Sequence, residues 1–503
     1  MPLADYRLRV DWEGQGTYGG SADVTARTLG VSWQRGRDFA SQLIGRSVAG
    51  RFAAQINNES GDYSSFNASS PLNGSLLPGR LVQVEGTAGG TSYILWTGYL
   101  QRIVPKPDAK GINSASLEAI GPSGFLNQRK VDMPMVTNML TGTAMGTILD
   151  NAGWGTARSL DAGRTTMTRF WASREPTINA LRLVEETEGG FVAEAKGGSI
   201  LFEDRYHRLA SPHTASQATF TDNPSGTLFY TGIEQEDPLP GIFNIMEAEV
   251  QLFAVGSLAT LWTLAESGTD SPLVEKDQSK SYWAQYPTPD SPTDAVGVDA
   301  WTVPAGTTDY TASATAGTGT ELTASFAATA TRYGNSMLVT MTNNGTSDGY
   351  LTKLQARGTP VTKLDPVKVS AEDGTSQSVY GERTYPSPAR FIPDTGEAQD
   401  WCDWNLGIYK SPIPIVAISF VANRNAAHMT QALSRDISDR ITIVGTGSAG
   451  LGVAEDFFIE AEHHRVDSHR THTVTWECSQ AARYSDAWVL DVSALGTSTR
   501  LTY

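Results

Sequence analysis

Polar and apolar residues alternate one by one through much of the first 125 residues. Leu8, Val10 and Trp12 are separated by charged residues, and residues 51–56 repeat the alternation. Because successive side chains of a strand point to opposite faces, a period of two predicts strands that are buried on one face only. A run of turn-forming residues, 57–79, interrupts these strands. The N-terminal part is therefore expected to be a β-barrel or sandwich.

The period changes between about Val131 and Leu209. Residues 143–154 and 176–190 have helical spacing, and the second segment stops at Gly189-Gly190, which is typical of a helix C-terminus. Residues 191–206 predict a hairpin that turns at Gly197-Gly198. This part is expected to be a small α+β domain.

Short β-like runs return from residue 213 to about 350. The portion 267–331 is poor in large aliphatic residues, so it is expected to be a loosely packed β-module or an insertion, and its strands cannot be placed. Residues 396–409 predict the one later helix, with Trp401, Trp404 and Ile408 on one side.

Two segments of similar pattern lie far apart, at 79–104 and 439–466. Each begins near an arginine (Arg80, Arg440), continues as an apolar strand, turns through a Gly- and Thr-rich loop and returns as a second strand. The second strands end at Arg102-Ile103 and Arg465-Val466, and a third strand-like run follows each. Such a repeat suggests one supersecondary unit that is used twice.

The repeat bears on residues 445–450, GTGSAG, which have the glycine spacing of a dinucleotide-binding turn after a β-branched run. The matching loop of the first segment has no such fingerprint, and only about fifty residues follow Gly450, too few for a nucleotide-binding half. We therefore expect a hairpin without a cofactor, with Gly86 and Gly445 in the positive-φ conformation.

The hairpin after residue 453 has a predicted register. If Asp467-Ser468 is a two-residue turn, His463 lies opposite His472 and Ile459 lies opposite Trp476. His463 and His472 are then the candidate metal ligands of this sequence. No spacing specifies a third ligand, so we predict no metal site and interpret these histidines as polar residues at the solvent-exposed end of the hairpin.

The motifs that could indicate an enzyme are weak. Gly345–Gly349 matches GxSxG, but strand-like segments lie on both sides, whereas a nucleophile elbow needs a helix after the serine. The acid pairs Glu185-Glu186 and Asp436/Asp439 could be glycosidase carboxylates, yet neighbouring acids are usually a solvated face. No HExxH motif is present. We predict no catalytic residue and no enzyme.

Composition and charge argue against further classes of protein. With 54 acidic and 38 basic residues the net charge is −16, which disfavours nonspecific binding to DNA or to an anionic membrane. No stretch approaches eighteen consecutive apolar residues, so no membrane-spanning segment is expected, and the N-terminus lacks a signal-peptide pattern, which suits production in the cytoplasm. Cys402 and Cys478 lie far apart and indicate neither a disulfide framework nor a zinc site.

Several stretches resemble the baseplate hub or minor tail (tail-tip) proteins of tailed bacteriophages, a family related to the central hub of contractile tails. They are residues 45–84, 96–103, 147–154, 168–208, 434–466 and 486–501. The resemblance covers most of the chain and is weakest over 260–430. Its motifs specify an architecture rather than an active site.

The resemblance implies a mainly β fold: two related β-barrel domains that form a doubled hub, with an α+β domain between them. The expected divisions are a barrel at 1–127, an α+β domain at 128–212, a β-rich and partly insertion-like region at 213–430, and the C-terminal part of the second barrel at 431–503, completed by strands from about 213–255. A trimer would then place six barrels in a ring, which matches a six-fold tail tube.

The implied function is that of a structural virion protein at the distal end of a tail, made in the host cytoplasm. The homotrimer would adapt the six-fold tail tube to a three-fold tip, contact the distal tail or tail tube protein and the tape measure protein, attach fibres or a spike, and leave a channel for DNA exit without specific binding. An acidic bore would ease that passage. The alternatives are a cell-wall hydrolase and a receptor- or carbohydrate-binding tip module that uses the tryptophans Trp262, Trp283, Trp301, Trp401 and Trp404.

Overall fold

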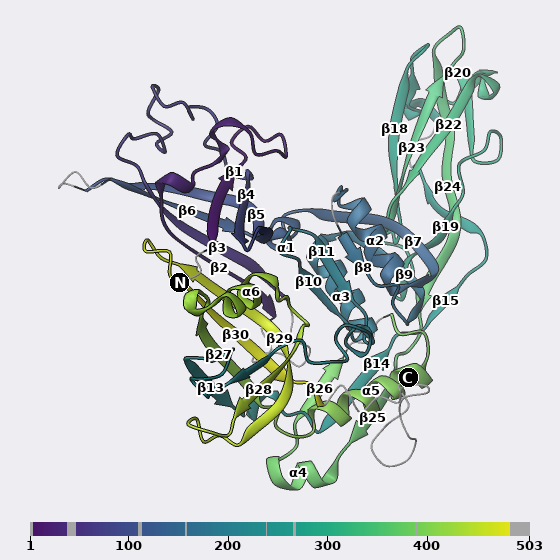
Figure 1. The fold of residues 1–503 in the computed structure, drawn as a ribbon. Coiled ribbons are helices and arrows are strands. Elements are labelled where there is room, and N and C mark those ends of the chain that lie inside the picture. Colours follow the sequence, from purple (N-terminus) through teal and green to yellow (C-terminus); the bar gives the residue numbers. More distant parts are fainter. Residues whose placement is uncertain are drawn as a thin grey trace.

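The structure is a computed structural model that describes residues 4–37, 47–108, 113–155, 158–237, 239–264, 268–387 and 391–482. The chain is mainly β with a smaller α+β part, as predicted (Figure 1). The C-terminal stretch of the resemblance, residues 486–501, lies outside the described residues.

One twelve-stranded sheet joins the two ends of the chain. Ten of its strands follow one another in the order β1 (Asp5–Val10), β4 (Leu81–Ala88), β5 (Thr91–Lys106), β6 (Ser114–Ile120), β3 (Ser47–Asn57), β2 (Thr28–Arg37), β29 (Val453–Val466), β30 (His472–Gln480), β27 (Ile415–Val421) and β13 (Gly232–Glu236). The other two are β28 (Arg440–Gly445), which pairs with β29, and β12 (Thr219–Thr221), which pairs with β28. Within the described ranges no strand pair closes either half on itself, so the two expected barrels form one continuous open sheet.

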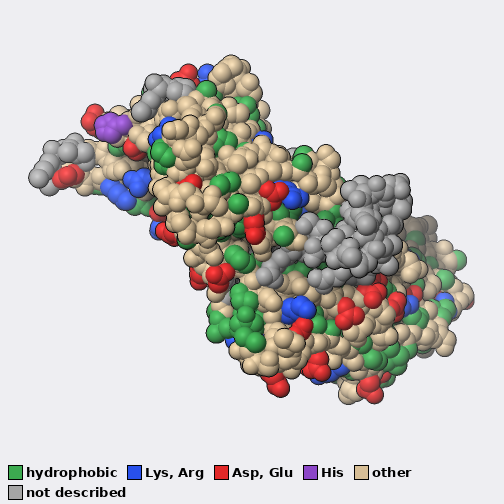
Figure 2. All heavy atoms as spheres, turned by 60° about the horizontal axis from the view of Figure 1, so that its bottom comes forward, with side chains coloured by type: hydrophobic (Ala, Val, Ile, Leu, Met, Phe, Trp, Pro, Cys, Tyr) green, Lys and Arg blue, Asp and Glu red, His purple; other side chains and the backbone are tan. Residues whose placement is uncertain are grey.

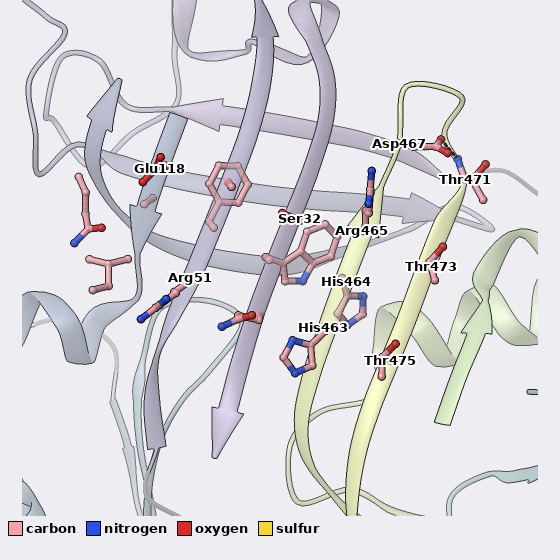
Figure 3. A pocket seen from close by; sticks show the side chains of 17 residues that line it. Ser32, Arg51, Glu118, His463, His464, Arg465, Asp467, Thr471, Thr473 and Thr475 are labelled. Atoms are coloured by element: carbon pink, nitrogen blue, oxygen red, sulfur yellow. Dashed lines mark hydrogen bonds between the residues drawn. The ribbon is translucent and has the colours of Figure 1, made fainter. Parts of the chain in front are cut away.

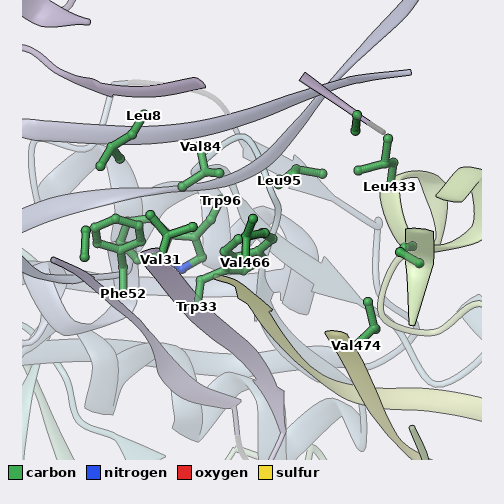
Figure 4. Close-up of a cluster of buried hydrophobic side chains, with 14 of the residues drawn as sticks. Leu8, Val31, Trp33, Phe52, Val84, Leu95, Trp96, Leu433, Val466 and Val474 are labelled. Carbon is green, nitrogen blue, oxygen red and sulfur yellow. The ribbon is translucent and has the colours of Figure 1, made fainter. Parts of the chain in front are cut away.

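The sheet buries one face in a single hydrophobic core that both halves share (Figure 4). Leu8, Phe52 and Trp96 come from the N-terminal half, while Val466 and Val474 come from the C-terminal half. The alternation that predicted these strands is the alternation of this buried face: β3 places Phe52 in the core and leaves its neighbour Arg51 exposed. The shared core makes the two halves one packing unit.

The α+β part packs beside this sheet around a second core. Its elements are α1 (Pro122–Leu126), β7 (Lys130–Leu140), α2 (Thr141–Asn151), β8 (Arg158–Leu160), β9 (Thr166–Pro176), α3 (Thr177–Glu188), β10 (Phe191–Glu194) and β11 (Ile200–Glu203). Both predicted helices and the predicted hairpin are present, and Gly189 ends α3 with φ 66°. A left-handed residue at this position is a common helix stop, and glycine adopts it without steric cost.

A third core lies between a small sheet and the predicted late helix. The elements of this part are β14 (Ile245–Val250), β25 (Val367–Glu372), α4 (Gly374–Tyr380), β26 (Thr384–Ser387) and α5 (Thr395–Tyr409). The last helix, α6 (Ala426–Ser434), packs in the core of the large sheet. Trp401 and Ile408 of α5 are buried, as their helical spacing predicts.

The region whose strands could not be placed is a projecting β-sandwich with its own core (Figure 1). Its strands are β15 (Phe253–Val255), β16 (Ala259–Thr263), β17 (Leu273–Val274), β18 (Ser279–Gln285), β19 (Ala295–Trp301), β20 (Tyr310–Thr315), β21 (Thr318–Glu321), β22 (Phe326–Arg332), β23 (Ser336–Asn343) and β24 (Gly349–Lys363). Thr329 and Thr331 of β22 are exposed, and β20 buries the small residues Ala312 and Ser313, which is why the sequence looks poor in large aliphatic residues.

The internal repeat is real, and the hydrogen bonds give its register. Gly79 N donates to Leu100 O at 2.7 Å, and Ser438 N donates to Ile459 O at 2.8 Å. One residue later each long strand has a β-bulge, between Leu100 and Arg102 in β5 and between Ile459 and Ala461 in β29. The unit β4–β5–β6 therefore matches β28–β29–β30. The predicted alignment of the strand ends was wrong, because Arg465 matches Lys106 rather than Arg102.

The last hairpin differs from its prediction in two ways: its five-residue loop changes the pairing, and the bulge at Glu460 changes which side chains face the core. An extra residue in one strand exchanges the two faces beyond it. His464 therefore points into the core and pairs with Val474, while His463 pairs with Thr475 and not with His472. The turn was wrong as well: the Asp467 carboxylate accepts hydrogen bonds from the backbone N–H groups of residues 469 and 471, which makes a five-residue loop.

The nucleotide-like glycines lie in a hairpin loop, as predicted, because β28 and β29 are antiparallel and adjacent. The positive-φ residues were misassigned. Gly450 and Gly452 have φ of 64° and 69°, whereas Gly445 is not in that region. Gly86 has a different role, because a Cβ there would lie 3.0 Å from side-chain atoms of Leu433 and Leu95. This close packing of α6 on β4 and β5 is what requires a small residue.

Candidate functional site

The side chains that suggested chemistry do not converge on a catalytic centre. GxSxG lies in the loop between β23 and β24, a strand-to-strand turn. Asp436 pairs with Arg35, and Asp439 pairs with Arg435 at 3.3 Å, so both acids belong to ion pairs. Glu185 accepts a hydrogen bond from Val192 N at 2.7 Å and ties α3 to the next strand. Each group has a structural role in the fold.

The predicted histidine pair is also not formed. His463 contacts Glu477 at 3.2 Å and lines the open side of the sheet, while His472 is buried on the other side. Among the residues that the structure describes, no group of three or more His, Cys, Asp or Glu side chains could hold a metal ion.

Buried ion pairs hold the junction where β2 meets β29. Arg35 Nε lies 2.6 Å from Glu462, and the Nη1 group of Arg35 donates to the Glu194 carbonyl at 2.7 Å. Arg37 lies 3.0 Å from Glu460 and 2.6 Å from Glu203. These two arginines of β2 therefore contact both the neighbouring strand β29 and the β10–β11 hairpin of the α+β part. These contacts lock the sheet and the α+β part together.

Glu460 is the central acid of this network and is also the bulge residue of β29. Arg208 forms a two-point contact with its carboxylate at 2.7 and 2.8 Å, and Ser479 donates a hydrogen bond at 2.5 Å. Burial alone would raise the pKa of Glu460, but Arg208 and Arg37 outweigh it and hold the pKa at about 2. The bulge residue thus places a carboxylate that is ionised at neutral pH against Arg37 and Arg208.

A chain of aromatic and imidazole groups continues the junction toward β1. The Tyr6 hydroxyl lies 2.7 Å from His472 Nδ1, and His472 Nε2 lies 2.9 Å from His464 Nδ1. His464 stacks on Trp33 with a centroid distance of 4.9 Å and lies 3.5 Å from Glu462. If the hydroxyl donates to His472 Nδ1, the Nε2–H group of His472 donates to His464 Nδ1, and both rings are neutral. Burial lowers the pKa of His464 and, more strongly, of His472.

The opposite face of the same strands is open and polar. Strands β6, β3, β2, β29 and β30 form an open groove of about 980 Å³ (Figure 3). Most of the residues that line it are polar, such as Ser32, Thr473 and Thr475. Its charges are mixed: Arg51 and Arg465 are basic, whereas Glu118 and Asp467 are acidic. This face spans both repeated units, and its polar side chains alternate with apolar lining residues such as Ala53 and Ile120.

Acidic side chains are spread over the face of the molecule shown in Figure 2, and no extended basic patch interrupts them in its described part. This agrees with the net charge of −16. No helix of the described chain is both long enough and apolar enough to span a bilayer.

Sequence reasoning missed both the ion network and the groove. The partners in the network are separated by 159 to 427 positions, so no local spacing reveals them. The one available signal was the unusual density of arginines in β2, at Arg35 and Arg37, within a strand whose neighbours are core residues.

Comparison with solved structures shows the fold of this chain in two tail proteins. The 43 kDa tail protein of prophage MuSo2 from Shewanella oneidensis aligns over 95% of this chain and 99% of its own, with a TM-score of 0.50 and 10% identity. A tail protein from Neisseria meningitidis MC58 aligns over 95% of this chain and 98% of its own, with a TM-score of 0.51 and 10% identity. No family model and no curated protein sequence matches the chain.

The ion network predicts a large cost for removing its central charge. Glu460→Gln leaves the buried Arg37 and Arg208 without their shared carboxylate, which should lower the free energy of unfolding by roughly 3–5 kcal/mol in denaturant titration. The matched control is Glu118→Gln on the exposed Arg102–Glu118 pair, where the expected loss is below about 1 kcal/mol. Equal effects of the two substitutions would contradict a central role for the network.

The buried imidazoles predict a pH-dependent stability. Because burial lowers the pKa of His472 well below 6.5, the unfolded chain binds its proton at a higher pH than the folded chain does, so stability falls as pH drops through 6.5. His472→Gln should therefore reduce the difference in melting temperature between pH 7.5 and 5.5. His469→Gln, in the exposed loop, serves as the control. An unchanged difference in the His472 variant would show that this histidine does not contribute.

Proposed function

We propose that this chain is a structural protein of a phage-type tail, acting as a baseplate hub at the distal end of the tail. The observation that supports this most directly is the doubled unit: β4–β5–β6 and β28–β29–β30 share hydrogen bonds and bulge, and they lie in one continuous sheet. The similarity of fold to two tail proteins over almost the whole chain supports the same role.

The doubled unit explains how such a hub would match its neighbours. Three copies with two equivalent units each present six similar surfaces around one axis, so a homotrimer can adapt a six-fold tail tube to a three-fold tip. On this proposal, the partners are the distal tail or tail tube protein and the tape measure protein on one side, and fibre or tip proteins on the other. The projecting β-sandwich is a surface that could hold a fibre or spike.

We further propose that the open polar face of the sheet lines a channel for DNA exit. The arginines of this face, Arg51 and Arg465, are balanced by Glu118 and Asp467, so it offers DNA no net positive charge to bind and passage would not depend on specific contacts. The groove residues are mixed in charge rather than acidic, so low adhesion, not repulsion, is the property that this face provides. No catalytic step is part of this role.

One observation favours the second candidate, a receptor- or carbohydrate-binding tip module. Of the five tryptophans that could stack on a sugar, Trp301 and Trp401 are buried, whereas Trp283 is 55% exposed. The ring centroids of Trp283 and Tyr333 are 5.2 Å apart. This pair is on the projecting β-sandwich. Sugar binding by the purified chain on a glycan array would favour this function.

The proposal predicts the mass and shape of the purified protein. Light scattering should give about three times the chain mass of 54.0 kDa, and negative-stain images should show a ring with an open centre. A chain that remains monomeric at high concentration and binds a sugar or cleaves peptidoglycan would contradict the hub and favour one of the alternatives.

A further inference from the structure

Two strand edges of the large sheet are unpaired in the described chain. β13 pairs only with β27, and residues 102–106 of β5 pair only with β6. The edge of β1 is different, because Leu8 N donates to the Thr25 hydroxyl at 2.9 Å and Val24 N donates to the Leu8 carbonyl at 3.0 Å, which covers it. Unpaired edges invite pairing with another strand.

The internal repeat gives each open edge an equivalent that is already paired. Residues 102–106 of β5 match residues 461–465 of β29, by the shared bulge. β13 matches β2 through two equivalent rows of residues across the sheet. In one row, Gly232 of β13 lies opposite Ser419 of β27, which lies opposite Thr475 of β30. In the other row, Gly30 of β2 lies opposite Gln55 of β3, which lies opposite Ser116 of β6. Inside the chain, β2 and β29 pair with each other along this very stretch.

We propose that β13 of one copy pairs with residues 102–106 of β5 in the next copy, and so repeats between copies the junction that β2 and β29 form within one. The contact between copies would use the same register as β2 and β29, in which Ser32 lies opposite Arg465 and Gln34 lies opposite His463. It places Glu234 opposite Lys106 and Glu236 opposite Val104. This inference rests on the trimeric hub and specifies its subunit contact.

Burial supports the assignment. In the paired stretch of β29, Ala461, Glu462 and His464 are buried, whereas the matching residues of β5 are exposed or half-buried. β13 is exposed at four of its five residues, whereas β2 buries Val31 and Trp33 at the matching positions. The two edges therefore lack the cover that their equivalents have.

Charge complementarity supports a second copy as the occupant. The outward side chains of β13 are Glu234 and Glu236, followed by Asp237, while the open stretch of β5 has Arg102 and Lys106. Opposite charges across neighbouring strands are favourable, and like charges are unfavourable, so neither edge would pair with itself. Because β13 and β5 are different surfaces, the contact is head-to-tail, which generates a closed ring and removes the free edges.

The register can be tested by cross-linking the full chain. Glu234→Cys combined with Lys106→Cys places the two thiols opposite each other between copies, and the native cysteines Cys402 and Cys478 are both buried. Under mild oxidation we expect covalent dimers and trimers. The matched control combines Gln235→Cys with Lys106→Cys, because adjacent side chains of a strand point to opposite faces, and it should not cross-link.

Charge exchange provides a second test. Glu234→Lys should weaken self-association by roughly fivefold per contact, and adding Lys106→Glu in the same chain should restore it. A trimer that forms without the matched cross-link would overturn the edge pairing but leave the tail function standing. Matched cross-linking in a chain that does not form trimers would support the pairing and contradict the trimeric hub. Absence of cross-links at high protein concentration would overturn the pairing.

Discussion

The pairing of β2 with β29 is the contact on which the rest of the structure depends. It joins strands from the two ends of the chain into one sheet, and it gives both halves a common core. Its buried arginines also bind the α+β part through Glu203 and the Glu194 carbonyl. Since removing one partner from a buried ion network leaves an uncompensated charge, the network favours a single relative placement of the three parts. The open groove exists on the other face because these strands stay in register.

Local pattern was sufficient for many elements but not for their pairing. It missed the helices α4 and α6 and did not place the strands of residues 267–331. The alternation of the N-terminal strands, both helices of the α+β part, helix α5 and the strand nature of residues 453–466 were confirmed, because each depends on periodicity and on turn residues within a short window. The register of the last hairpin was wrong because its loop has five residues instead of two, and the facing of its side chains was wrong because the bulge residue Glu460 exchanges the two faces beyond it; that residue is paired with an arginine 252 positions away. The two expected barrels are not closed within the described residues. Closure would require the first and last strands of a sheet to pair, and local pattern does not specify such pairing.

The ion network and the groove could not be predicted from local spacing, because their residues come from distant parts of the chain. Histidine spacing suggested His463 and His472, yet the fold separates them and brings His464 to His472 instead. What the sequence could indicate was the repeat, and the repeat is the functional feature on our account. The fold is shared with two tail proteins at only 10% identity. On our proposal, function follows from the use of one unit twice.

The measurement that tests this account most directly is a cryo-electron microscopy reconstruction of the assembled ring, at a resolution that separates strands. The account predicts three copies with six equivalent three-stranded units around the axis, the groove of Arg51 and Arg465 facing the lumen, and strand pairing that continues from each copy to the next. A ring whose groove faces outward, or particles in which the sheets of neighbouring copies do not meet, would contradict it.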